Sequence, residues 1–220
     1  VILSSPSSED DATMKKRKLR DIGVSAIGMG CMDFTHAYGD GPEEAEGIRL
    51  VHKAFELGCN FFDTAEKYSY FKNEEFVGKA LEDSLRRLQT DYIDIYTEHQ
   101  MEDGTEEQVA YIMGELIKEG KIRAWGQSSS TAEQIRKANA VTPITAIQSE
   151  YSMMERKWEK DVLPLCRELG IGYVAFAPMG NGFLSGKYHS GDHFQKNDLR
   201  KMSVFYEMFK WGYQTLYASN

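Results

Sequence analysis

A carboxylate and a phenol lie five residues apart, just after a short apolar run. Asp63 follows Phe61 and Phe62 directly, and Tyr68 comes five residues later. The run is too short for a helix and begins after Gly58, so it predicts a buried parallel strand with Asp63 at its carboxyl end. In an α/β barrel, the loops at the carboxyl ends of the strands converge on one mouth, where catalytic groups collect. Asp63 and Tyr68 therefore predict a catalytic site at such a mouth.

A histidine occupies a similar position further along the chain. The segment from Tyr92 to Tyr96 predicts a second strand, and His99 follows it. Each residue alone has a simpler explanation, because an aspartate at a strand end often caps a turn and a lone histidine is usually structural. Taken with Tyr68, their shared position at the ends of strands favours a functional mouth.

The rest of the chain alternates between helical and strand patterns. Apolar residues recur at helical spacing in segments that begin with acidic residues and often end at glycine. The predicted helices are Pro42 to Gly58, Asn73 to Leu88, Glu106 to Glu119, Thr131 to Ala140 and Asp161 to Leu169. The predicted strands are Val24 to Met32, Asn60 to Asp63, Tyr92 to Tyr96, Ile122 to Gln127, Ile144 to Gln148 and Tyr173 to Ala177. About six β/α steps predict an α/β fold with a parallel sheet, and their uniformity favours a barrel.

Composition narrows the class of protein. The chain has 220 residues, 41% of them hydrophobic, which predicts one globular domain with a sizeable core. A net charge of −8 argues against nucleic acid as a partner, because phosphate binding needs a positive face. The three cysteines, Cys31, Cys59 and Cys166, have the spacing of neither a disulfide framework nor a metal site. They fit a reducing compartment, and no apolar run reaches the ~20 residues of a membrane span. We expect a cytoplasmic protein.

The amino-terminal region has two parts. Residues 1–13 are rich in serine and acidic residues without a period, which predicts a disordered leader before residue 14. The basic run from Lys15 to Arg20 is followed by Ile22 and Val24, and this pattern indicates a short hairpin with solvated charges rather than a nucleic-acid patch.

Five segments resemble one known family. They occur in consistent order within the span from about Lys15 to Arg200: DTAEKY at 63–68, NEEFVGKAL at 73–81, LQTDYIDIY at 88–96, QSEYS at 148–152 and GFLSGK at 182–187. Together they resemble the aldo-keto reductases. The resemblance implies a TIM-type (β/α)₈ barrel over residues 14–202. It also implies NADPH as cofactor and reduction of an aldehyde or ketone, a small-molecule carbonyl substrate, to an alcohol.

The resemblance assigns catalytic roles to the strand-end residues. The family uses Asp, Tyr, Lys and His, and Tyr68 matches the proton donor to the carbonyl oxygen. A phenol has a pKa near 10, so a neighbouring lysine is needed to bring it toward the working pH. Asp63 matches the residue that orients this lysine, and His99 matches the one that helps to place the carbonyl.

The same resemblance assigns cofactor contacts. Ser128 and Ser129, where the family often has Ser-Asn, would hold the nicotinamide carboxamide together with Gln148. Phe176 takes the place of the aromatic residue that stacks on the nicotinamide, and stacking needs only a ring face. Phe176 could equally be a core residue, because aromatic residues in strands are often buried.

Two departures from the family pattern affect the expected activity. The third strand, which carries the family's lysine, is missing between Leu81 and Glu82, where two helices are joined. The resemblance also fades after Arg200, so the eighth strand and the basic stretch that binds the cofactor 2′-phosphate are missing as well. Two hypotheses follow. The first is an oxidoreductase whose gaps are either tolerated or reflect an internal segment that is missing from this sequence. The second is a truncated, non-catalytic relative that serves as a binding or assembly module.

The last residues have a pattern of their own. Phe205, Phe209, Tyr213 and Tyr217 recur every four residues and predict an atypical aromatic helix at 203–220. Its stripe fits packing better than recognition, and it could cover a sheet edge left open by the missing strands. An uncovered edge would allow a homo-oligomer to form.

Overall fold

The computed structural model describes residues 14–31, 43–63, 91–188, 194 and 198–202. The predicted leader, the helix from Asn73 to Leu88 and the aromatic helix at 203–220 lie outside these residues, and so does Tyr68. In the part of the chain that is described, no helix is long and apolar enough to cross a membrane.

The described part begins with the predicted hairpin. Strand β1 (Lys16–Leu19) pairs antiparallel with β2 (Ile22–Ser25), in a register that places Leu19 opposite Ile22. Arg20 adopts a positive φ of 51° in the two-residue turn between the strands. The lysine and arginine side chains of β1 are exposed and Leu19 is buried, which confirms a hairpin with solvated charges.

The remaining strands are parallel and alternate with helices, as predicted. The strands are β3 (Met29–Gly30), β4 (Phe62–Asp63), β5 (Ile93–Glu98), β6 (Ile122–Ser128), β7 (Ala146–Glu150) and β8 (Gly172–Phe176). The helices are α1 (Glu44–Glu56), α3 (Glu106–Lys118), α4 (Ala132–Val141) and α5 (Val162–Leu169). Strand β3 pairs with β4, and β5 to β8 form a four-stranded sheet in chain order. Most boundaries lie within two residues of those predicted, although the expected strand from Val24 to Met32 divides into the end of β2 and the short β3.

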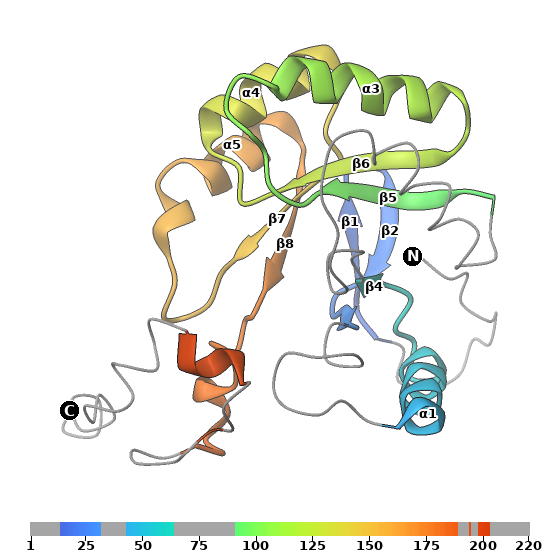
Figure 1. Cartoon of the computed structure of the whole chain (residues 1–220), viewed down its shortest axis with the longest axis vertical. Helices are drawn as coiled ribbons and strands as arrows, with labels where there is room; N and C mark the ends of the chain where they lie inside the picture. The colour runs from blue at the N-terminus through green and yellow to red at the C-terminus, as the bar shows by residue number, and fades with distance from the viewer. Residues whose placement is uncertain (1–13, 32–42, 64–90, 189–193, 195–197, 203–220) are drawn as a thin grey trace.

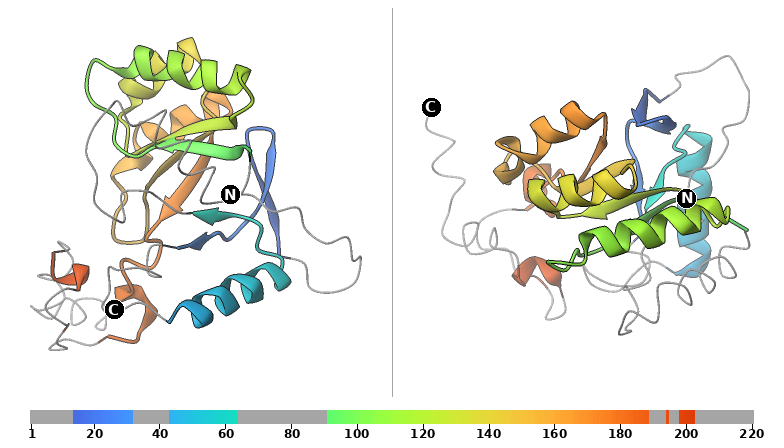
Figure 2. Two further views of the ribbon diagram at one scale, coloured as in Figure 1. Left: turned by 45° about the vertical axis from the view of Figure 1, so that its right-hand side comes forward. Right: turned by 90° about the horizontal axis from the view of Figure 1, so that it is seen from above.

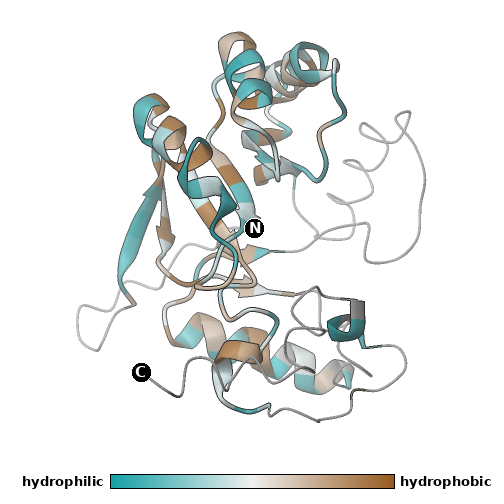
Figure 3. Cartoon of the chain, turned by 90° about the vertical axis from the view of Figure 1, so that its left-hand side faces the viewer, coloured by the Kyte–Doolittle hydropathy of each residue, from teal (hydrophilic) through white to brown (hydrophobic). Residues whose placement is uncertain are grey.

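Helices α3, α4 and α5 cover one face of the four-stranded sheet, and the hairpin lies against the other (Figure 1). The views in Figure 2 show the same layers, with α1 beside β4. Colour alternates between brown and teal along these helices (Figure 3), as it should when each has one apolar side. The main core fills the space between the helices and the sheet; its buried members include Met113, Trp125, Ile135, Ile147 and Val162.

A second apolar cluster packs on the opposite face, where the hairpin closes one end of the sheet. Leu19 and Val24 are buried there with Ala146, and Val174 packs against them. The contact is so close that a Cβ at Gly172 would lie 2.6 Å from the Leu19 Cα. Only glycine therefore fits at the start of β8 while the hairpin stays in place.

Arg20 fixes the tip of this hairpin to the ends of two helix–strand units. Its Nε donates to the carbonyl of Ile144 at 3.0 Å, and its Nη2 donates to the carbonyl of Leu169 at 3.3 Å. Leu169 is the last residue of α5, which ends at Gly170 in the left-handed conformation with φ 65°. The partly buried backbone carbonyls just before β7 and at the end of α5 thus gain a charged donor.

We expect Arg20→Met to lower the free energy of unfolding by about 1–3 kcal/mol, because partly buried carbonyls lose their hydrogen-bond donor. Urea denaturation followed by circular dichroism measures this loss. Arg17→Met is the matched control, because Arg17 is exposed on the same hairpin and its guanidinium reaches only the carbonyl of Lys16. An equal loss in both variants would contradict the assigned role of Arg20.

Candidate active site

The alternation of side chains along β7 and β8 defines which residues face away from the helices. Ile147 and Tyr173 belong to the core beneath the helices, whereas Ala146 and Val174 pack in the cluster on the opposite face. Because successive side chains of a strand point to opposite faces, Gln148 lies on the same face as Ala146. This is the inner face, turned away from α3, α4 and α5.

Gln148 connects the four-stranded sheet to the strand that carries Asp63. The Gln148 Nε2 donates a hydrogen bond of 3.0 Å to Asp63 Oδ2, although the two residues are 85 positions apart. Both side chains are partly buried. Two residues predicted from the sequence to belong to one site are therefore in direct contact, at the carboxyl ends of β4 and β7.

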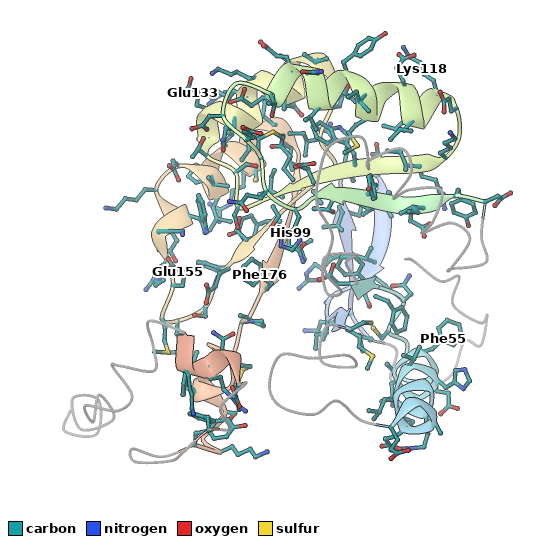
Figure 4. All side chains as sticks on the ribbon, viewed as in Figure 1. Phe55, His99, Lys118, Glu133, Glu155 and Phe176 are labelled. Atoms are coloured by element: carbon teal, nitrogen blue, oxygen red, sulfur yellow. The ribbon has the colours of Figure 1, made fainter. Side chains whose placement is uncertain are left out.

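Strand register places two more predicted residues at this level. Ser128, the last residue of β6, is the register partner of Gln148, and its side chain is 9% exposed. Glu98 is the register partner of Gln127, so His99 follows β5 at the level of Ser128. His99 is exposed, and Figure 4 shows it where β5 ends.

Phe176 ends β8 on the same face. It pairs in register with Glu150 and is 38% exposed, so it is not a core residue. Figure 4 shows its ring at the end of β8. Of the two interpretations of the sequence, the structure therefore excludes burial and leaves a ring face accessible for stacking.

Ser129 differs from the other predicted cofactor residues. Its backbone is left-handed, with φ 56°, and its N–H donates to the carbonyl of Gln148 at 2.8 Å. Ala177, the residue after β8, also has a positive φ, of 47°. Left-handed backbone at residues other than glycine costs free energy and is concentrated at functional sites. Here it occurs at the ends of two strands that carry candidate site residues.

A cavity of about 490 Å³ lies beyond the end of β8, and the sequence analysis did not predict it. Its walls include Met179, Asn181 and Gly182 from the loop after β8, together with the cations Lys187 and Arg200. It begins at Ala177, directly after Phe176. None of the predicted site residues that the structure describes lines this cavity, and the cations in its wall would suit an anionic ligand.

Arg200 is held rigidly in the wall of this cavity. It is 9% exposed, and its Nε donates to Asp198 Oδ1 at 2.9 Å. Its guanidinium stacks on the rings of Phe194 and Tyr188, with 4.4 and 4.6 Å to their centroids, and it also donates to the Tyr188 hydroxyl. Burial opposes ionisation of Asp198, but the hydrogen bonds from Arg200 outweigh it and hold the pKa of this carboxyl below its usual range.

One further residue of the inner face was missed. Glu150 lies two positions after Gln148 and therefore points to the same side of β7. The alternation of Gln148 and Glu150 was visible in the sequence, but nothing there fixed which face of β7 is the inner one. The hairpin and Asp63 determine that face, through contacts between residues far apart in the chain.

Comparisons with known proteins bear on the family and the fold of the chain. The model of the "Aldo/keto reductase family" matches residues 26–84 and 79–218. The chain belongs to the aldo-keto reductase family. A probable aldo-keto reductase 1 from Glycine max is 37% identical, over 74% of this chain and 58% of that protein. The chain thus spans less than two thirds of the length of this curated relative of the family.

Solved structures of family members have the same fold. Glycerol dehydrogenase AKR11B4 from Gluconobacter oxydans superimposes with a TM-score of 0.77 at 26% identity, covering 87% of this chain and 71% of that one. The holo form of aldo-keto reductase AKR11C1 from Bacillus halodurans gives 0.71 at 28% identity, covering 88% and 76%. The described α/β layers are therefore those of a TIM-type (β/α)₈ barrel.

The family match comes in two segments, which overlap at residues 79–84. This is where the sequence analysis places the missing helix–strand unit, between Leu81 and Glu82. The second segment runs to residue 218, so the match continues beyond Arg200, where we expected the resemblance to the aldo-keto reductases to fade.

The contact between Asp63 and Gln148 predicts energetic coupling. In a double-mutant cycle of Asp63→Ala and Gln148→Ala, we expect a coupling free energy of about 0.5–3 kcal/mol, measured by urea denaturation. Lys118→Ala, on the outer surface of α3, combined with Gln148→Ala is the control pair and should be additive within about 0.5 kcal/mol. Additivity of Asp63→Ala with Gln148→Ala would contradict the contact between β4 and β7.

Proposed function

We propose that this chain carries the active site of a cytoplasmic, NADPH-dependent reductase that converts an aldehyde or ketone to an alcohol. The observation that carries the proposal is the hydrogen bond between Gln148 and Asp63, because it joins the proposed cofactor face to the proposed catalytic strand end. The register of β5 to β8 brings His99, Ser128 and Phe176 to the same edge.

We assign the handling of the carbonyl oxygen to Tyr68 and His99. Tyr68 donates the proton, and His99, exposed beyond β5, hydrogen-bonds the carbonyl oxygen and orients it. Asp63 keeps one carboxyl oxygen on Gln148 and has a second to orient a cation beside Tyr68. This division of work needs a proton donor and a carbonyl-binding group at one mouth, and the carboxyl ends of barrel strands are where such groups collect.

We assign the cofactor to the face that ends at Phe176. NADPH, when bound, supplies the hydride that adds to the carbonyl carbon. The carboxamide is hydrogen-bonded by the side-chain oxygen Oε1 of Gln148, which takes no part in the bond to Asp63, and by the hydroxyls of Ser128 and Ser129. The accessible ring of Phe176 stacks on the nicotinamide. Lys187 offers a charged donor to a phosphate from the wall of the adjoining cavity, where the Arg200 guanidinium is already paired with Asp198.

A second candidate function is that of a non-catalytic binding or assembly module. It is favoured by the missing lysine between Leu81 and Glu82 and by the division of the family match at that position. In this case the cofactor face would bind its ligand while Tyr68 lacked the cation that lowers the pKa of a phenol.

Restoration of the missing unit, combined with Tyr68→Phe, tests the assignment of Tyr68 as proton donor. For the 220 residues alone we expect NADPH binding, detected by nicotinamide fluorescence, with barely measurable carbonyl reduction. Insertion of a family helix–strand unit with its lysine between Leu81 and Glu82 should raise turnover by about 10²- to 10⁴-fold, and Tyr68→Phe should abolish the gain. Ordinary turnover without the insertion, unchanged by Tyr68→Phe, would overturn the assignment of the proton donor.

Lys187→Ala tests the phosphate assignment. We expect the dissociation constant for NADPH to rise about tenfold, equivalent to about 1.4 kcal/mol, because a charged donor to a phosphate is lost. Lys118→Ala is the control, since Lys118 is an exposed lysine that pairs with Glu115 on α3. Equal affinities in the two variants, measured by fluorescence titration, would remove Lys187 from the cofactor site.

A further inference from the structure

Glu150 is a carboxylate on the inner face that no step of the proposed reaction uses. It ends β7, two residues after Gln148, and its register partner on β8 is Phe176. The ladder continues past it, because the Tyr151 N–H donates to the Phe176 carbonyl at 3.3 Å. Glu150 thus lies beside the ring to which we assign stacking of the nicotinamide.

One oxygen of this carboxylate is buried without a partner. Among the described residues, no hydrogen bond reaches Glu150 Oε1, which has less than 1 Å² of accessible surface. A buried acceptor without a donor is costly, and a catalytic role or a bound ion is among the reasons for which proteins keep one. Burial, and after it the charge of Glu155, raise the pKa of Glu150, while Lys157 opposes them.

The loop after β7 holds these charges close to Glu150. The Ser152 hydroxyl accepts from the N–H groups of Met154 and Glu155, and the Glu155 carboxylate accepts from the N–H of Lys157. Among the described residues that act on the pKa of Glu150, Glu155 and Lys157 carry opposite charges, so they leave the negative charge of Glu150 itself largely unbalanced. A positively charged group on Phe176 would balance it.

We propose that Glu150 is a positioning residue whose carboxylate favours the positively charged, oxidised nicotinamide ring over the neutral, reduced ring. This inference rests on the proposed function, because it requires the nicotinamide to lie on Phe176. The two redox forms of the ring differ by one unit of charge, and a carboxylate in partly buried surroundings distinguishes them more strongly than it would in water. Preference for the oxidised form favours the direction of reaction that forms the alcohol.

The test measures the dissociation constants of NADP⁺ and NADPH separately, by titration calorimetry at pH 8, because the raised pKa of Glu150 makes an alkaline buffer favour the charged carboxylate. Glu150→Gln keeps the shape of the side chain and removes its charge. We expect the dissociation constant for NADP⁺ to rise about tenfold while that for NADPH changes by less than about twofold. Glu150→Asp keeps the charge and should retain part of the preference. Glu133→Gln removes an exposed carboxylate of α4 and should change neither constant.

Each other outcome is decisive. If Glu150→Gln weakens both redox forms equally, the residue is only structural and the proposal is wrong, although the cofactor site stands. If neither constant changes, Glu150 does not sense the nicotinamide, and again only this inference fails. If the unmodified chain binds neither form, both the inference and the proposed function are overturned. Thermal unfolding followed by circular dichroism identifies any variant that fails to fold.

Discussion

The hydrogen bond between Gln148 and Asp63 is the contact on which the site depends. The described parallel strands form two separate sheets, β3 with β4 and β5 through β8, and no backbone ladder joins them within the described residues. A side-chain bond between the two sheets fixes where Asp63 stands relative to the other strand ends. The strand itself is also held by the hydrogen bonds between Asn60 and Ser25 and by the packing of Phe61 on the hairpin cluster, so the bond to Gln148 fixes the Asp63 side chain beside the face that carries Ser128 and Phe176.

The strand ends that carry Ser128 and Phe176 are positioned by packing at the other end of the same sheet, where the hairpin lies against the starts of β7 and β8. Leu19 packs so closely on Gly172 that β8 cannot shift along the hairpin, and Arg20 ties the hairpin to Ile144, just before β7. Because β5 to β8 pair in a fixed register, this packing also fixes where the opposite ends of the four strands lie relative to one another. Packing at one end of the strands thus sets the geometry of polar groups at the other, a division of work typical of α/β barrels.

The sequence predicted most of this architecture because the local patterns agree with one another. Helical periods located α1, α3, α4 and α5, with an acidic first turn as a further sign for α1, and strand-end polar residues located Asp63 and His99. Contacts between distant residues were beyond such reasoning. Whether Phe176 is buried depends on what covers β8, and whether Glu150 faces the site depends on which side of β7 meets the helices. Neither is encoded near those residues.

Negatively and positively charged side chains lie in different parts of the candidate site. Carboxylates gather at the ends of β4 and β7, whereas Lys187 and Arg200 line the cavity beyond β8. A ligand with an anionic portion and a ring that can become positive matches this separation, because each part then meets charge of the opposite sign. Arg200 is paired with Asp198 and stacked on two aromatic rings, so its guanidinium is held in place and its charge is largely offset. Lys187 therefore supplies most of the positive charge that this wall presents to an anion, and groups held in place in advance lose less free energy to ordering when a ligand binds.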